Sequence, residues 1–153
     1  MCSSDLERFP DAEAVIQAWP EEAFERIGID RATFIAVLTH DPKLDDAALG
    51  IALRSEAAYV GAMGSRRAQE KRRERLMEKG FGEEELDRLA GPIGLDLGAA
   101  GPEETALSVM AEVVAVRNGR EGGRLRDKQG GRIHEMDHRA QPAEPAASRR
   151  AGS

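Results

Sequence analysis

Three short apolar segments, each followed by a polar or glycine-rich turn, constrain the fold of this chain most. With their turns they cover residues 33–42, 58–67 and 91–98. The first two segments are apolar almost throughout, which is typical of strands buried on both faces of a parallel sheet. In open α/β sheets the ligand crevice lies beyond the carboxyl ends of the strands. The sequence therefore predicts an α/β fold with a binding site at one edge of its sheet.

Turn and cap signals divide the rest of the chain into alternating elements. The expected strands are 14–18, 34–38 and 57–63, with a glycine-interrupted strand or extended loop at 93–97. The expected helices are 20–27, about 42–54, 66–79, 83–89 and 102–118. For the second of these, Asp41 is one candidate N-cap, and Asp45 or Asp46 could cap a later start. Gly80 followed by Phe81 predicts a Schellman stop for the third helix. The last helix carries many apolar residues and few charges, so we expect it to be the most buried.

Composition limits the class of protein. The chain has 153 residues, of which 41% are hydrophobic and 33% charged, which suits one soluble domain. No apolar stretch approaches the roughly 18 residues of a membrane span, and the N-terminus lacks the features of a secretory signal. Cys2 is the single cysteine, which excludes a disulfide or thiolate metal cluster within the chain and favours the cytoplasm. A net charge of −6 argues against nucleic acid as the main partner.

The turn after the second buried segment has the composition of an anion site. Gly61 and Gly64 would let a phosphate approach the backbone, Ser65 and the following helix N-terminus would donate hydrogen bonds, and Arg66 or Arg67 would add positive charge. The alternative is a tight strand-to-helix turn with solvated arginines. Both interpretations fit the sequence.

Two further turns carry polar groups. Thr39, His40 and Asp41 follow the first buried segment, where they could transfer a proton, bind a metal or hold a hydroxyl; alternatively Asp41 caps a helix and His40 is a loop residue. In the third turn, Gly94 indicates a backbone that passes close to a ligand or to a neighbouring strand, and Asp96 is its ionisable group.

Helix 66–79 carries seven basic residues on a mostly polar surface. The run could dock an acidic partner, with Arg72 and Arg73 as the test positions. The alternative is a solvated helix face crossed by ion pairs with neighbouring glutamates.

No Gly-x-Gly-x-x-Gly follows a strand, although Rossmann folds place that fingerprint after their first strand. The pattern predicts a partial Rossmann-like sheet that the chain enters after the second strand. Segment 14–18 would then be an outer strand, separated from 34–38 by two strands that the chain does not contain. An open strand edge would follow, so we expect the isolated chain to be marginally stable or to dimerise along it.

Four strings together resemble the XdhC/CoxI family, in the C-terminal Rossmann-like domain of xanthine dehydrogenase accessory proteins. They are residues 38–46, 59–67, 91–99 and 111–117, and residues 8–12 are also similar. The resemblance covers about residues 7–119. It leaves residues 1–6 as a disordered leader and residues 120–153, rich in glycine, arginine, alanine and proline, as a disordered tail.

The resemblance implies a chaperone-like accessory protein that works by binding and transfer rather than by turnover. Such proteins bind molybdenum cofactor, support its sulfuration and deliver it to a molybdenum hydroxylase such as xanthine dehydrogenase, with a cysteine desulfurase as a further partner. The implied pocket residues are Thr39, His40, Asp41, Gly61, Gly64, Ser65, Arg66, Arg67, Gly94 and Asp96. The alternative is a fragment of an NAD(P)-dependent oxidoreductase that uses the same crevice.

Overall fold

The protein is built on a small parallel sheet, as the sequence predicts. The computed structural model describes residues 8–127. Strands β1 (Phe34–Val37), β2 (Tyr59–Ala62) and β3 (Leu89–Ala90) pair in the order β1-β2-β3, and all of them are parallel. Phe34 lies opposite Tyr59, and Val60 lies opposite Leu89. The predicted fold class, a partial Rossmann-like sheet with flanking helices, is confirmed.

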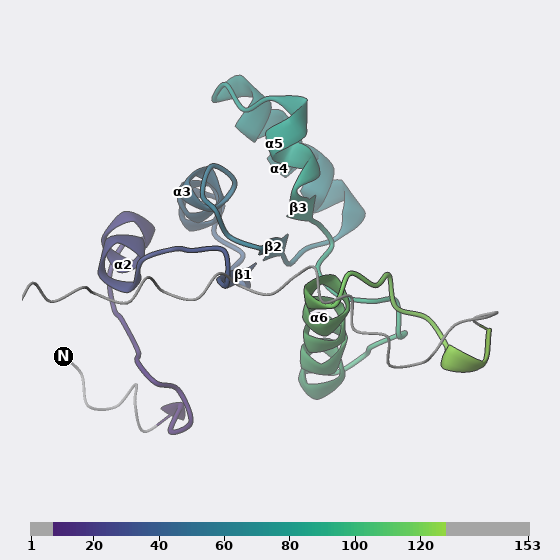
Figure 1. The fold of residues 1–153 in the computed structure, drawn as a ribbon. Coiled ribbons are helices and arrows are strands. Elements are labelled where there is room, and N and C mark those ends of the chain that lie inside the picture. Colours follow the sequence, from purple (N-terminus) through teal and green to yellow (C-terminus); the bar gives the residue numbers. More distant parts are fainter. Residues whose placement is uncertain (1–7, 128–153) are drawn as a thin grey trace, which may run out of the picture.

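Helices cover the two faces of the sheet unequally. In Figure 1, α3 and α4 lie on one side of the strands and α6 lies on the other, while α2 packs beside α3. The helices are α2 (Pro20–Ile27), α3 (Pro42–Ala52), α4 (Arg66–Glu78), α5 (Glu83–Asp87) and α6 (Pro102–Arg117), and a 3-10 turn, η1, covers Leu125–Asp127.

The hydrophobic core lies on the face covered by α3 and α4. Alternate strand residues point to this side because side chains alternate along a strand. They meet buried leucines of α3, of the segment after it and of α4. The core includes Ile35, Val37, Val60, Ala62, Leu49, Leu53 and Leu76. This compact layer fixes the carboxyl ends of β1 and β2 side by side.

Local cap signals in the sequence are confirmed. Asp41 caps α3 by accepting from the Lys43 amide at 2.9 Å, and Ser65 caps α4 by accepting from the Ala68 amide at 3.2 Å. At the other end of α4, the Gly80 and Phe81 amides donate to the carbonyls of Met77 and Leu76, which is the bonding of a Schellman stop.

Some predicted elements are wrong. Residues 14–18 form no strand, because an apolar pair such as Val15 and Ile16 needs a neighbouring strand and the part of the chain in view offers none there. Segment 93–97 is a loop, which is one of the two forms expected for it. The short helix predicted for 83–89 ends at Asp87, and Leu89 instead begins β3.

The expected burial of α6 is also wrong. Within the helix, Ser108 and Val109 are buried, whereas Leu107 is 64% exposed and Met110 56% exposed. Glu112 of the helix accepts a hydrogen bond from Tyr59 of β2, and no further layer among residues 8–127 covers the outer side of the helix (Figure 1). Apolar composition predicted burial, but the number of layers decides it.

The predicted tail begins within the described residues. Arg120 donates its amide to the Ala115 carbonyl at 2.8 Å, and η1 follows. The predicted disorder of residues 1–6, and of the tail from 128 onward, lies outside the described residues. From 8 to 127, no helix is long and apolar enough to cross a membrane.

Candidate functional site

The first two predicted turns lie next to each other at the carboxyl edge of the sheet. The Met63 amide donates to the Val37 carbonyl at 2.9 Å, so the chain leaves β1 and β2 side by side. This places the Thr39 turn beside the turn of Gly64 and Ser65. The sequence argument that parallel strands bring their exit loops together holds for this pair.

A buried ion pair lies beneath these two turns. The Arg72 guanidinium on α4 donates to Asp45 of α3, with an Nη2···Oδ2 distance of 2.7 Å, and the two side chains are only 5% and 3% exposed. The second Asp45 carboxylate oxygen accepts from the Thr39 hydroxyl. Asp45 therefore connects the turn after β1 to the helix after β2.

The same network reaches the backbone at the end of β2. Arg72 also donates to the Met63 carbonyl at 3.2 Å and to the Gln69 side-chain oxygen. The Gln69 amide group donates to the Ala62 carbonyl at 3.0 Å and to the Gly64 carbonyl at 3.4 Å. Among the described side chains, the Nε atom of Arg72 is the one buried polar atom without a partner. These bonds fix the shape of the turn that carries Ser65.

Much of the basic surface predicted on α4 is used inside the molecule. Asp46 accepts from Arg75 at 2.9 and 3.0 Å and from Lys79 at 3.1 Å. Burial alone would raise the pKa of Asp46, but the hydrogen bonds and charges of these two cations outweigh it and lower that pKa. Arg73 pairs with two acids of α5, Glu83 and Asp87.

The docking hypothesis built on Arg72 and Arg73 is therefore wrong in its choice of residues. Arg72 is buried, and Arg73 is engaged by α5. Among the residues described, Arg66, Arg67 and Lys71 are the α4 cations that form no ion pair. Two of these three lie in the first turn of the helix, next to Ser65.

That first turn keeps donors directed at solvent. The Ser65 hydroxyl oxygen accepts from Ala68, which leaves its proton free to donate. The Arg66 and Arg67 amides stand at helix positions that lack an intrahelical acceptor. Their side chains are exposed. Together with the positive end of the helix dipole, these groups suit an anion.

The glycines of the predicted site make room for protein groups. A Cβ on Gly61 would lie 2.6 Å from Ile93 Cδ1 and from the Tyr59 hydroxyl, and one on Gly94 would lie 2.4 Å from Ser108 Oγ. Gly64 has φ of +134°, a backbone conformation that residues other than glycine rarely adopt. Each glycine is thus explained by packing or backbone conformation without a ligand.

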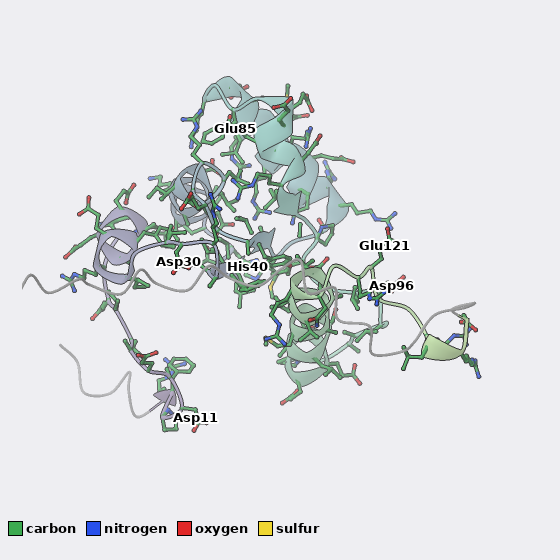
Figure 2. All side chains as sticks on the ribbon, viewed as in Figure 1. Asp11, Asp30, His40, Glu85, Asp96 and Glu121 are labelled. Carbon is green, nitrogen blue, oxygen red and sulfur yellow. The ribbon has the colours of Figure 1, made fainter. Side chains whose placement is uncertain are left out.

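The polar residues predicted for the site do not all come together. His40 and Asp41 are exposed, and Asp41 serves as the α3 cap. In Figure 2, His40 lies near the end of β1, whereas Asp96 lies beside α6, away from it. Asp96 is exposed and forms no hydrogen bond to any residue in the 8–127 range. It does not join the β1–β2 exits.

The loop that carries Asp96 begins at the sheet and then crosses to α6. The Ile93 amide donates to the Ala62 carbonyl at 3.1 Å, which extends the edge of β2. The Gly94 amide then donates to Glu112 of α6 at 2.7 Å, and the same Glu112 oxygen accepts from the Tyr59 hydroxyl. Burial, together with the hydrogen bond to Glu112, raises the pKa of Tyr59, so its hydroxyl stays protonated as a donor.

A cavity of about 370 Å³ lies between α4, α5 and the segment that contains β3. Its walls are Arg66, Gln69, Glu70, Arg73, Leu86, Leu89, Gly91 and Pro92. It shares Arg66 with the predicted site and contains none of Thr39, Ser65 or Asp96. Within residues 8–127, no three potential metal ligands lie together.

Sequence reasoning missed three residues of this region. From the sequence, Asp45 is predicted only as a possible helix cap and Arg72 only as a surface charge, because charged residues are seldom fully buried. Glu112 is a lone acid in the largely apolar second half of α6, and that isolation was the available signal.

Comparisons with known proteins agree with the fold. A family model described as the XdhC Rossmann domain matches residues 3–113. The chain is 32% identical over 116 residues to a protein of Bacillus subtilis (strain 168) described as a probable component of xanthine dehydrogenase, covering 76% of this chain and 32% of that protein. It is 36% identical over 89 residues to the molybdenum cofactor insertion chaperone PaoD of Escherichia coli (strain K12), covering 58% of this chain and 28% of the chaperone.

A solved structure is also similar. It is a crystal structure from Bacillus halodurans described as a xanthine dehydrogenase, with a TM-score of 0.62 and 28% sequence identity. The similarity covers 81% of this chain and 34% of that one. The chain thus spans about a third or less of the length of the relatives that it matches.

Proposed function

This chain belongs to the XdhC family, in its Rossmann domain, and from that membership we propose that it is an accessory protein for molybdenum hydroxylases. It would bind molybdenum cofactor as cargo, support its sulfuration and hand it to an enzyme of the xanthine dehydrogenase type. A cysteine desulfurase is the proposed sulfur donor, and the cytoplasm is the proposed compartment. The names of the chaperone and the xanthine dehydrogenase relatives support this assignment.

The turn at the start of α4 is the observation that carries the proposal. It offers the Ser65 hydroxyl, two first-turn amides and the exposed guanidinium groups of Arg66 and Arg67. Molybdenum cofactor carries a phosphate on its pterin, and this donor set fits a phosphate. The chemistry on the metal belongs to the cofactor; the contribution of the chain is to hold the anionic end.

The other predicted residues take different parts in the proposed site. Thr39 directs its hydroxyl proton to Asp45, so it supports the site from below. His40 and Asp41 lie at the mouth of the β1 exit, where they can contact cargo. Gly61, Gly64 and Gly94 shape the backbone, and Asp96 lies too far toward α6 to share the phosphate position.

A retention assay tests the proposal. The full chain is mixed with molybdenum cofactor released from a purified molybdenum enzyme, passed through a desalting column, and assayed for pterin by fluorescence after oxidation. We expect the wild type to retain cofactor and a double Arg66→Ala, Arg67→Ala variant to retain about tenfold less, because two charge-assisted contacts are lost. Lys71→Ala is the matched control, since Lys71 is an exposed cation on the same helix.

Two results would contradict the proposal. The first is a wild-type chain that retains no cofactor. The second is equal loss in the double variant and in Lys71→Ala, which would indicate a general charge effect. A parallel titration with NADPH tests the oxidoreductase alternative: saturable binding that Arg66→Ala abolishes would favour it.

A further inference from the structure

One carboxylate oxygen on α6 connects the sheet to the loop that follows β3. Glu112 Oε2 accepts from the Tyr59 hydroxyl on β2 and from the Gly94 amide at 2.7 Å. These partners lie 53 and 18 residues before it in the sequence. No other side chain in the described part of the chain bonds both the sheet and this loop.

The loop fits closely against α6 where Glu112 holds it. A Cβ on Gly94 would lie 2.4 Å from Ser108 Oγ, and Gly94 has φ of +105°. The Ser108 hydroxyl donates to the Leu95 carbonyl, and the Leu95 amide donates back to the Ser108 carbonyl at 3.2 Å. Two helix residues one turn apart, Ser108 and Glu112, therefore fix two consecutive loop residues.

Beyond Leu95 the loop is held differently. Residues 96–100 are exposed, and their contact with α6 runs through Glu104, which accepts from the Ala100 amide at 2.8 Å. The position of Gly94 relative to α6 consequently depends on Glu112, which is the helix side chain that accepts from the Gly94 amide. The neighbouring bond from the Ile93 amide to the Ala62 carbonyl fixes the loop at the sheet but not at α6.

We propose that Glu112 is a positioning residue that holds segment 93–95 at the carboxyl end of β2 and thereby shapes the proposed cofactor site. The effect on the cofactor site rests on the proposed function, whereas the fixing of segment 93–95 by Glu112 does not. Ile93 covers Gly61, and Gly61 leads directly into the Ser65 turn, so a displaced loop would uncover the end of β2. Glu112 acts through the loop and touches no proposed cargo contact.

Three variants separate this role from a general effect on stability. Glu112→Ala removes the acceptor, and Glu112→Gln restores an uncharged one of the same shape. Tyr59→Phe removes the other donor and leaves the Gly94 bond intact. Glu104→Gln is the matched control, because Glu104 also accepts a loop amide on the same helix.

The first measurement is hydrogen exchange of the Gly94 amide by NMR in the full chain. We expect exchange about tenfold faster in Glu112→Ala, largely restored in Glu112→Gln, and little changed in Tyr59→Phe and Glu104→Gln. The second measurement is cofactor retention as above, with the same order among the variants. If exchange of the Gly94 amide became equally faster in Tyr59→Phe and in Glu112→Ala, Glu112 would stabilise the whole fold rather than position the loop.

Other outcomes overturn distinct parts. Unchanged Gly94 exchange in Glu112→Ala would overturn the positioning role. Faster exchange with unchanged retention would show that the loop does not shape the site. A wild-type chain without retained cofactor would overturn the proposed function, and Gly94 exchange would still decide whether Glu112 holds the loop.

Discussion

Asp45 and Arg72 meet at 2.7 Å beneath the exits of β1 and β2, and both side chains are almost fully buried. The pair joins α3 to α4, and through Thr39 and Gln69 it reaches both exit turns. A buried pair of this kind costs desolvation energy, which its hydrogen bonds offset only while both partners are present. Because it lies beneath both exit turns, the ion pair supports the backbone of the proposed site.

Removing one partner of this pair should destabilise the protein strongly. We expect Asp45→Ala to lower the free energy of unfolding by about 3–5 kcal/mol, because Arg72 would remain buried without its counter-charge. The double variant Asp45→Ala, Arg72→Met should lose clearly less than the sum of the two single losses. Urea unfolding of the wild type, the two single variants and the double variant completes this double-mutant cycle. Additive losses in the free energy of unfolding would show that the two side chains do not interact.

Acid should remove the contribution of Asp46. Its pKa is lowered in the folded state, because the hydrogen bonds and charges of Arg75 and Lys79 outweigh burial. The unfolded carboxyl therefore binds a proton more readily, so the contribution is complete above the ordinary aspartate pKa of about 4 and is lost below it. The stability difference between wild type and Asp46→Asn, measured by urea unfolding from pH 7 to pH 3, should shrink below about pH 4. A difference that stays constant with pH would contradict this.

Two glycine substitutions should have opposite effects. Gly61→Ala forces a Cβ to within 2.6 Å of Ile93 and Tyr59, so we expect a loss of about 1–3 kcal/mol through overpacking. Gly50 lies within α3, and a Cβ there would be at an ordinary contact distance of 3.6 Å from Phe81. Because alanine favours a helix over glycine by up to about 1 kcal/mol, we expect Gly50→Ala to stabilise the protein. Thermal melts of both variants test the pair, and a stabilising Gly61→Ala would contradict the packing around β2.

The open edge of β1 should make the chain associate with itself. Within residues 8–127 β1 ends the sheet, and Leu38, which follows the strand, is 51% exposed. Lysine at a strand edge opposes pairing with another strand. We expect Leu38→Lys to shift the chain toward monomer in analytical ultracentrifugation, whereas Ile27→Lys, an exposed position on α2, should not. A wild-type monomer with a sharp two-state melt at all concentrations would contradict the prediction.

Local signals were enough to predict the frame of the fold. Asp41, Ser65 and Gly80 mark helix ends through bonds to residues two or three positions away, so a short stretch of sequence contains all that is needed. The continuous apolar runs of β1 and β2 are equally local. The confirmed parallel sheet follows from these features together.

Features that depend on distant partners could not be predicted in this way. β3 has two residues, too few to show any periodicity, and it exists because β2 lies beside it. The Asp45–Arg72 pair joins residues 27 positions apart. For the site, sequence predicted the adjacent exits of β1 and β2 but placed Asp96 with them, since the crossing of its loop to α6 depends on Glu112.

The attachment of the Gly94 loop to α6 also has a consequence for biosynthesis. A ribosome releases β1, β2 and α4 well before it releases Glu112, so the core can close while the loop still lacks its anchor. We expect the cargo-facing edge to take its final form later than the core on the α3 and α4 side of the sheet. Binding competence would then arise only once α6 has been translated.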